Sequence, residues 1–158
     1  MRIALFQPDI PQNTGTILRM AACLDLPVDI IGPAGFDISD RALKRTGLDY
    51  LPHATLRRHA CWDEFLAWHG ESPAGRLVLF TTKANHPYTS FDFLPDDILL
   101  FGRESAGAPD YVHNAADARL SIPLKPGLRS LNIAVAAAMA LGEALRQTAG
   151  FPAGTASR

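Results

Sequence analysis

The chain has 158 residues, of which 47% are hydrophobic and 20% are charged, as is typical of a folded domain and not of a disordered chain. Lys and Arg total 15 against 16 acidic residues, which excludes a histone-like polycation, so any nucleic-acid partner must be held by local basic patches. This length fits a single compact unit. We expect one domain over residues 1–150 and a flexible tail over residues 151–158.

The two cysteines, Cys23 and Cys61, are far apart and lack the spacing of a metal site or a disulfide framework. The five histidines show no metal-ligand spacing and are expected at surface or loop positions. The apolar stretches at the N-terminus and over residues 133–142 are too short for a signal peptide or a membrane span. We therefore expect a cytoplasmic protein without a metal or a membrane anchor.

Short apolar runs alternate along the chain with helical patterns. Strands are predicted over Ile3–Phe6, Val28–Ile31, Leu77–Thr81, Ile98–Phe101 and Leu120–Ile122. Helices are predicted over Thr14–Leu24 with Asn13 as N-cap, Ser39–Thr46 ending at Gly47, Trp62–His69 ending at Gly70, and Leu131–Gln147. Several strands are apolar throughout and must be covered on both faces. The sequence therefore predicts an α/β fold, with a mostly parallel sheet flanked by helices.

The segment "QPDIPQNTGTILRMA", residues 7–21, joins the first predicted strand to the first helix. A helix N-terminus in this position offers free N–H groups and a positive dipole end to an anion. Arg19 lies one and a half turns into the helix. A purely structural interpretation fits as well, with Asn13 as a cap and Arg19 in a surface ion pair.

The segment "LLFGRESAGAPD", residues 99–110, leaves a buried strand in a sharp turn. Gly102 and Gly107 allow close approach of the backbone to a ligand or a positive φ. Glu104 follows the carboxyl end of the strand, where open α/β sheets bind ligands. It also fits a solvated charge pair with Arg103. The spacing is not that of a G-x-S-x-G nucleophile elbow.

The segment "SIPLKPGLRSLNIAVAAAM", residues 121–139, stays irregular until Ser130 or Asn132 starts the last helix. Arg129, Ser130 and Asn132 thus gather at a helix N-terminus, although capping alone would explain Ser130. Together, the three junctions predict one cleft at one edge of the sheet. The absence of G-x-G-x-x-G and G-x-x-x-x-G-K-[ST] disfavours a dinucleotide site and an NTPase.

Two groups of basic residues are candidates for binding nucleic acid. Arg41, Lys44 and Arg45 share one helical face, and the run Arg57, Arg58 and His59 forms a second cluster. A solvated helix face explains the first group equally well.

Four segments, "IPQNTGTILRMA", "GFDISDRALKRTGLDY", "LLFGRESAGAP" and "IPLKPGLRSLN", resemble in this order the motifs of the SPOUT class of RNA 2′-O-ribose methyltransferases. The resemblance covers about residues 2–147 and is greatest to the bacterial enzymes that methylate the wobble nucleotide, position 34, of leucine tRNAs. It implies S-adenosylmethionine as cofactor, a deep C-terminal trefoil knot, a homodimer in which the last helix helps form the interface, and the anticodon arm of tRNA as partner.

The resemblance also implies roles for individual residues. Cofactor contacts are expected at Phe80, Gly102, Ile122, Ser130 and Leu131. The active centre is expected at Asn13, Arg19, Glu104, Ser130 and Asn132. RNA contacts are expected at Arg41, Lys44, Arg45, Arg57, Arg58 and Arg129. Because a guanidinium is not deprotonated in proteins, we expect Arg19 to hold a phosphate beside the target ribose, while that phosphate, a water or Glu104 accepts the proton.

The chain departs from the family pattern at Ile133, Ala134 and Val135, where relatives read Leu-Ser-Asn, and at Gly142, where a relative has Tyr. Three alternatives therefore stay open. The chain could methylate another tRNA or rRNA position, serve as a non-catalytic RNA-binding module of the same fold, or be an α/β protein that binds a small molecule and no RNA.

Overall fold

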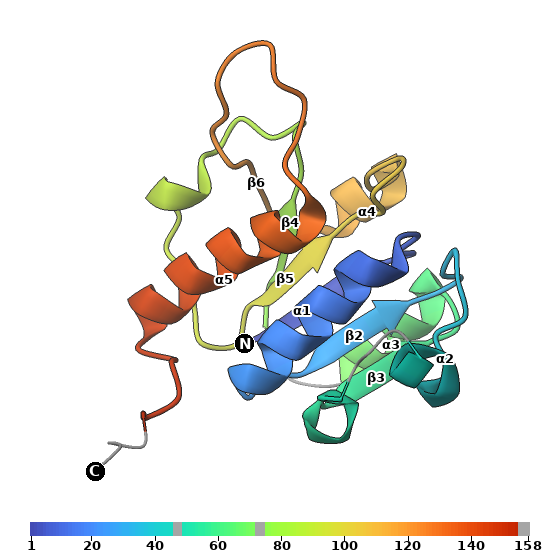
Figure 1. Cartoon of the computed structure of the whole chain (residues 1–158). Coiled ribbons are helices and arrows are strands. Elements are labelled where there is room, and N and C mark those ends of the chain that lie inside the picture. The colour runs from blue at the N-terminus through green and yellow to red at the C-terminus, as the bar shows by residue number, and fades with distance from the viewer. Residues whose placement is uncertain (46–48, 72–74, 155–158) are drawn as a thin grey trace.

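A computed structural model describes residues 1–45, 49–71 and 75–154 of the chain. The core is a six-stranded parallel sheet in the order β3-β2-β1-β5-β4-β6 (Figure 1). The strands are β1 (Arg2–Phe6), β2 (Val28–Ile31), β3 (Leu56–His59), β4 (Leu77–Phe80), β5 (Ile98–Phe101) and β6 (Ala118–Leu120). The predicted parallel sheet is confirmed.

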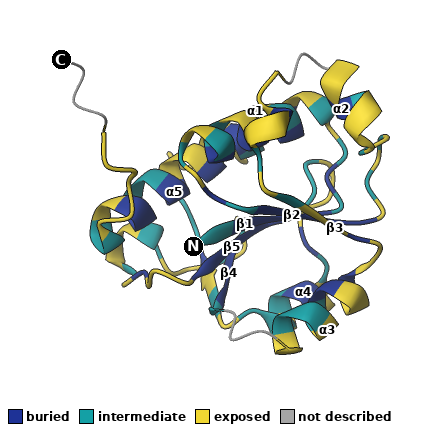
Figure 2. Ribbon diagram, turned by 90° about the horizontal axis from the view of Figure 1, so that it is seen from below, coloured by how far each residue is buried: buried dark blue, intermediate teal, exposed yellow. Residues whose placement is uncertain are grey.

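The described residues contain five α-helices, of which four lie between strands and the last follows β6. They are α1 (Pro11–Cys23), α2 (Asp40–Arg45), α3 (Trp62–Glu71), α4 (Asp110–Ala115) and α5 (Ile133–Thr148). Single 3₁₀ turns occur at Leu51–His53 and Tyr88–Ser90. Helices α1 and α5 cover one face of the sheet, and α3 and α4 cover the other (Figure 2).

Several predicted boundaries are wrong. Helix α1 begins at Pro11, whose missing N–H costs nothing in the first turn, so Asn13 lies inside the helix and is not its N-cap. Gly70 is helical and does not end α3. The last strand ends at Leu120, because Ser121 instead forms an isolated bridge with Pro87. The predicted helix end at Thr46 and Gly47 lies outside the described residues.

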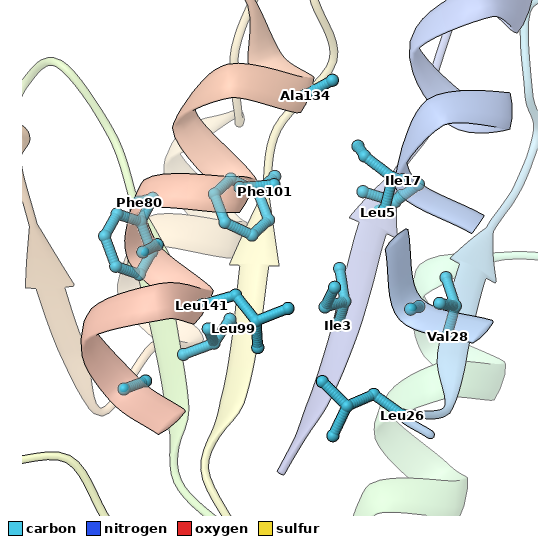
Figure 3. Close-up of a cluster of buried hydrophobic side chains, with 14 of the residues drawn as sticks. Ile3, Leu5, Ile17, Leu26, Val28, Phe80, Leu99, Phe101, Ala134 and Leu141 are labelled. Carbon is cyan, nitrogen blue, oxygen red and sulfur yellow. The ribbon is translucent and has the colours of Figure 1, made fainter. Parts of the chain in front are cut away.

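The hydrophobic core lies on both faces of the sheet because alternate strand residues point to opposite faces. On one face, Ile3, Leu5 and Leu99 pack against Ile17 of α1 and Leu141 of α5 (Figure 3). The side of α5 that packs on this face carries Ala134, Ala137, Ala140 and Ala144, whose small side chains let the helix lie close to β5. Ala4, Phe6 and Leu100 face α3 and α4 on the other side.

Strand β3, at one edge of the sheet, is not among the predicted strands, because its four residues include two arginines and no apolar run. Its last residue, His59, was expected at the surface, but it is 3% exposed. His59 Nε2 lies 2.8 Å from Asp29 Oδ1, and Arg2 Nε donates to the other oxygen of Asp29 at 2.6 Å. The expected surface role of His59 is therefore wrong.

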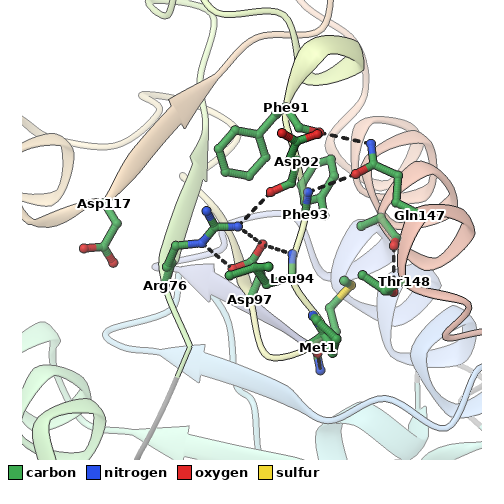
Figure 4. Close-up of polar contacts among 12 residues, drawn as sticks. Met1, Arg76, Phe91, Asp92, Phe93, Leu94, Asp97, Asp117, Gln147 and Thr148 are labelled. Carbon is green, nitrogen blue, oxygen red and sulfur yellow. Dashed lines mark hydrogen bonds and ion pairs between the residues drawn. The ribbon is translucent and has the colours of Figure 1, made fainter.

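A polar network joins the amino ends of the strands (Figure 4). Asp97, with no exposed surface, accepts hydrogen bonds from Arg76 Nε and Nη2 and from the Leu94 N–H. The carboxylate of Asp97 raises the pKa of Arg76. The Gln147 amide at the end of α5 bonds to the backbone of Phe91 and Phe93. This network ties the β4–β5 connection to the last helix.

The chain reverses its winding direction at β1, whose neighbours are β2 and β5. In open α/β sheets a crevice for ligands forms at such a switch point, outside the carboxyl ends of the strands. Within the described residues, none of the helices combines the length and hydrophobicity needed to cross a bilayer, and no three His, Cys, Asp or Glu side chains are grouped to hold a metal.

Candidate active site

A cavity of about 560 Å³ lies at the carboxyl edge of the sheet, at the switch point. The start of α1, the segments after β4 and β5, and the β6–α5 connection all line it. The structure thus brings the three polar junctions of the sequence together. Among the residues expected from the resemblance, the cavity is lined by Phe80, Gly102, Ile122, Leu131, Asn13, Glu104, Arg129, Ser130 and Asn132.

The turn after β5 is closed by reciprocal backbone bonds. The Gly107 N–H donates to the Arg103 carbonyl at 2.8 Å, and the Arg103 N–H donates to the Gly107 carbonyl at 3.3 Å. Gly107 has a φ of 67°, which favours glycine. A Cβ atom on Gly102 would lie 2.5 Å from the Ala108 nitrogen, so no larger residue fits there. The two glycines let the turn fold back tightly beside the cavity.

A chain of side-chain amides crosses from the last helix to the first. Asn132 is the N-cap of α5, and its Oδ1 accepts hydrogen bonds from the N–H groups of Ala134 and Val135. Its Nδ2 therefore donates to Asn13 Oδ1, at 2.9 Å. This bond orients the Asn13 amide, so that Asn13 Nδ2 faces Glu104 Oε1 at 3.4 Å. This series of hydrogen-bonded side chains ends at the carboxylate of Glu104.

The other oxygen of that carboxylate is held by the loop after β1. Glu104 Oε2 accepts the Asp9 backbone N–H at 2.9 Å. The loop starts at Gln7, whose φ is 45° and whose N–H donates to the Ile31 carbonyl. It is wedged against Gly35, where a Cβ would lie 2.8 Å from the Cβ of Asp9. Glu104 is therefore fixed from both sides.

The Asp9 side chain contacts the same turn and was not found from the sequence. Its Oδ2 accepts the Ser105 hydroxyl and lies 3.5 Å from Arg103 Nε. The adjacent Glu104 side chain, and then the hydrogen bonds with Ser105, lower the pKa of Asp9. The signal available in the sequence was its position, directly after a strand that neighbours β5 in the sheet.

Three buried polar atoms near the cavity have no hydrogen-bond partner within the described residues. They are Asp9 Oδ1, Arg103 Nε and His113 Nε2, and both Arg103 and His113 line the cavity. Lys83 also lines it and was not singled out from the sequence. Since buried polar groups are normally satisfied, these atoms indicate a polar ligand. Asp9 and Arg103 lie in junctions that the sequence singled out, but neither was assigned a role at the site, and His113 lies in no motif.

Arg19 does not line this cavity. It is exposed on α1, and its guanidinium lies 4.6 Å from the centre of the Tyr50 ring. Six residues separate it from Asn13, which places it about 9 Å further along the helix and about 240° around it. Within one chain, Arg19 and the amide chain therefore face different directions.

The basic residues expected to contact RNA differ in whether they already interact with other side chains of the protein. Arg41, Lys44 and Arg45 are exposed on α2 and form no ion pair within the described part of the chain. Arg58 pairs with Asp40 at 2.6 Å, and the Arg57 guanidinium lies 4.6 Å from the Trp68 ring. The α2 cations are thus the freer of the two groups.

Comparison with known proteins identifies the class to which this site belongs. Residues 1–142 match the SpoU rRNA Methylase family, and the chain belongs to this family. The resemblance to RNA methyltransferases seen in the sequence is thereby confirmed, as is the expectation that the chain is an enzyme.

Particular relatives narrow the comparison. The chain is 61% identical over 145 residues to a tRNA (cytidine(34)-2′-O)-methyltransferase of Beijerinckia indica, covering 92% of this chain and 90% of the relative. It is 51% identical over 151 residues to the protein of the same name from Ancylobacter novellus, and this match covers 96% of this chain and 95% of the relative.

Two solved structures show the same architecture. One is from work on the 2-OH methylation of C/U34 on tRNA. Its TM-score is 0.83 at 42% identity, and the match covers 92% of this chain and 94% of the solved chain. The other is the SpoU methyltransferase AviRb from Streptomyces viridochromogenes in complex with the cofactor AdoMet. Its TM-score is 0.82 at 28% identity, and the match covers 93% of this chain and 60% of AviRb.

Proposed function

We propose that this chain transfers a methyl group from S-adenosylmethionine to the ribose 2′-hydroxyl of the wobble nucleotide, position 34, of leucine tRNAs. The target nucleotide is cytidine or a modified uridine. The observation that carries the proposal is a cavity lined both by apolar residues and by the hydrogen-bonded side chains of Asn132, Asn13 and Glu104. The names of the relatives at 61% and 51% identity support the choice of position 34.

The cavity fits an adenosine-containing methyl donor. Phe80, Ile122 and Leu131 supply apolar surface for an adenine ring, and the tight turn at Gly102 leaves main-chain groups accessible for hydrogen bonds. Ser130 lines the same region. When bound, S-adenosylmethionine supplies an electrophilic methyl group on a positively charged sulfur. The AdoMet-bound AviRb structure, which shares this architecture, supports the assignment of the donor.

The reaction breaks the bond from sulfur to methyl carbon and forms a bond from that carbon to the 2′-oxygen, which loses its proton. The protein must align the two centres and receive the proton. Each oxygen of Glu104 already accepts one N–H, from Asp9 or Asn13, and each retains a further lone pair. We assign proton acceptance to Glu104, directly or through a water, with the amide chain holding it in place.

We also propose that the protein is a homodimer and that Arg19 of one subunit acts at the cavity of the other. Val135, Met139 and Gly142 share one face of α5, where Val135 is 50% and Met139 39% exposed. A Cβ on Gly142 would meet nothing within 4 Å, which leaves room for a second chain. Because Arg19 faces away from the cavity of its own chain, it would act from the second subunit, where it would hold a phosphate beside the target ribose.

The anticodon arm is proposed to lie across the basic residues Arg41, Lys44, Arg45, Arg57, Arg58 and Arg129. Arg129 lines the cavity, and the α2 cations are free of ion pairs within the described residues. Binding dominated by phosphate contacts weakens steeply with salt, by roughly one log unit per log of salt for each phosphate contact. A shallow salt dependence of tRNA binding would contradict this docking.

A trefoil knot in the C-terminal part is the remaining element of the proposal. The segment after β6 is bonded to the β4–β5 connection at two places, since Ser121 N–H donates to the His86 carbonyl and Tyr88 N–H to the Ser121 carbonyl. The far end of α5 is bonded to the same connection through Gln147. These contacts support a path of the last segment through that connection.

The experiment that tests the proposed function uses labelled S-adenosylmethionine, purified protein and total tRNA from a strain that lacks the wobble methylation. Nucleoside mapping should place the label on the 2′-oxygen of position 34 of leucine tRNAs. Label at another position of tRNA, or label only on added rRNA, would assign a different substrate to the same site. Absence of both labelling and donor binding would contradict a methyltransferase function.

A further inference from the structure

Arg103 is the one arginine of the described residues with a buried side-chain nitrogen that has no hydrogen-bond partner. Arg2, Arg58, Arg76, Arg119 and Arg146 each donate a hydrogen bond to a protein oxygen, and Arg19 and Arg57 lie over aromatic rings. Arg103 lines the cavity, yet its Nε is buried without a hydrogen-bond partner. A guanidinium carries five N–H donors in a rigid fork that matches an oxyanion. An acceptor from a ligand would complete it.

Asp9 holds the turn that carries this guanidinium. It contacts three successive residues of the turn: Arg103 through an ion pair at 3.5 Å, Glu104 through its backbone N–H, and Ser105 through the hydroxyl. The ion pair is too loose for a hydrogen bond to Arg103 Nε, and Asp9 Oδ1 is also without a partner. Asp9 therefore holds the guanidinium near the cavity without using up its N–H groups.

The charge of the cavity favours an anionic group near Arg103. Lys83, Arg103 and Arg129 line it with three cations, whereas Glu104 is the one carboxylate among the lining residues. Asp9 and Glu104 both contact the turn, so the charge of Arg103 is offset there, and Lys83 and Arg129 add two further cations to the cavity lining. An oxyanion entering the cavity would meet a guanidinium whose Nε has no hydrogen-bond partner in the described residues.

We propose that Arg103 binds an oxyanion of a substrate in this cavity and that Asp9 is the residue that positions Arg103 to do so. The inference rests on the proposed function. Two oxyanions have the required chemistry: the carboxylate of the methionine part of the donor, and a phosphate of the RNA next to the target ribose. Both offer the paired oxygens that a guanidinium fork recognises.

The test compares Arg103→Met and Arg103→Lys with wild type in three measurements on the full chain. Calorimetry gives the affinity for S-adenosylhomocysteine and for 5′-methylthioadenosine, which has the same nucleoside but no carboxylate. Steady-state kinetics give the KM for tRNA. Lys125→Met is the matched control, since it removes one exposed cation of the neighbouring segment that does not line the cavity.

If the oxyanion is the donor carboxylate, Arg103→Met weakens S-adenosylhomocysteine binding by about tenfold or more and leaves 5′-methylthioadenosine within about twofold. If it is an RNA phosphate, Arg103→Met raises the KM for tRNA by about tenfold with donor binding unchanged. Arg103→Lys should recover only part of either loss, because it keeps the charge and loses the fork. Equal behaviour of Arg103→Met and Lys125→Met in all three measurements would overturn the inference.

A double-mutant cycle tests the part played by Asp9. Asp9→Asn keeps the size of the side chain and the backbone N–H to Glu104 but removes the charge that faces Arg103. On its own it should weaken the affected affinity by about threefold, and combined with Arg103→Met it should add nothing further. Full additivity of the two losses would show that Asp9 does not act through Arg103.

Measurements on the wild-type protein distinguish a failure of this inference from a failure of the proposed function. If wild type binds S-adenosylhomocysteine and methylates tRNA while Arg103→Met is unaffected, the inference fails and the proposed function stands. If wild type does neither, both fail.

Discussion

The two edges of the sheet carry polar networks that differ in how completely they are satisfied. At the amino edge, both oxygens of Asp97 are engaged by Arg76 and the Leu94 N–H, and Asp97 has no exposed surface (Figure 4). At the carboxyl edge, Glu104 is also engaged at both oxygens, but Arg103 Nε and His113 Nε2, of two residues that line the same cavity, have no hydrogen-bond partner in the described residues.

This difference distinguishes a network that stabilises the fold from one arranged for a ligand. When a buried carboxylate has all its hydrogen-bond partners, removal of one partner lowers the free energy of unfolding substantially. Such a carboxylate has no free position for a ligand. A network with unsatisfied donors is completed only when a ligand supplies acceptors. Substitutions at the amino edge should therefore change stability, and substitutions at the carboxyl edge should change binding and turnover.

The largest effect is expected for Glu104→Gln. Glutamine cannot accept a proton, and its amide group would face Asn13 Nδ2 with a second donor. The kcat for tRNA methylation should fall by roughly 100- to 1000-fold, while the unfolding midpoint in urea changes little. A variant that keeps more than about a tenth of wild-type kcat would remove Glu104 from the proton transfer.

The counterpart at the amino edge is Asp97→Asn. It removes the charge that holds the partly exposed Arg76 and weakens the charged hydrogen bonds of a buried carboxylate, so it should lower the free energy of unfolding by about 2 kcal/mol. Urea denaturation measures this loss. The kcat of the protein that remains folded should equal that of wild type, and a selective loss of kcat would mean that the two edges are coupled.

Gly102→Ala tests the tight turn beside the cavity. The added Cβ, 2.5 Å from the Ala108 nitrogen, must push the turn outward, so donor affinity should fall by about tenfold in calorimetry. Gly70→Ala is the matched control, since its Cβ meets nothing within 4 Å and α3 should gain about 0.5–1 kcal/mol of stability. Unchanged donor affinity in Gly102→Ala would place the donor elsewhere.

A pair of substitutions at Asn132 separates its two contacts. Asn132→Ala removes the N-cap of α5 and should cost about 1 kcal/mol of unfolding free energy. Asn132→Asp keeps a capping oxygen and should retain stability, but it cannot donate to Asn13. Both variants should lose turnover. If Asn132→Asp were as active as wild type, the amide chain would have no part in the reaction.

The smallest effect concerns the pH dependence of stability through Asp9. Its pKa in the folded protein lies below the usual 3.8, so its stabilising contribution is present above that pH and is lost as the pH falls through the folded-state value. Asp9→Asn should therefore be less stable than wild type at pH 7, with the gap closing below about pH 3.8. A stability gap that is the same at pH 7 and throughout the acid range in which wild type stays folded would show that the charge of Asp9 contributes nothing.

How far the sequence predicts this fold depends on burial. Strands β4 and β5 are apolar throughout, and β1 and β2 each carry one charged residue, Arg2 and Asp29, in an otherwise apolar run. Helices cover both faces of these strands, so their sequence alone locates them. The edge strand β3 contains Arg57 and Arg58 and carries no such signal. Asn13 looks like a cap by residue type, but Pro11 starts the helix two residues earlier.

The candidate site follows the same logic. Gly102 and Asn132 can be picked out in the sequence, because a tight turn and a helix N-cap restrict which residues fit there. Glu104 is found by its position two residues after Gly102. Asp9 and Arg103 carry no local mark. They meet only because β1 and β5 are neighbours in the sheet, a pairing that sequence periodicity does not reveal.

The central claim is that a methyl donor occupies the cavity at the carboxyl edge, between its apolar wall and the amide chain that ends on Glu104. A crystal structure of the protein soaked with S-adenosylhomocysteine tests it most directly. The account predicts density for the adenosine against Ile122 and Leu131, with the sulfur on the side of Glu104. Density at any other site, with this cavity empty, would contradict it.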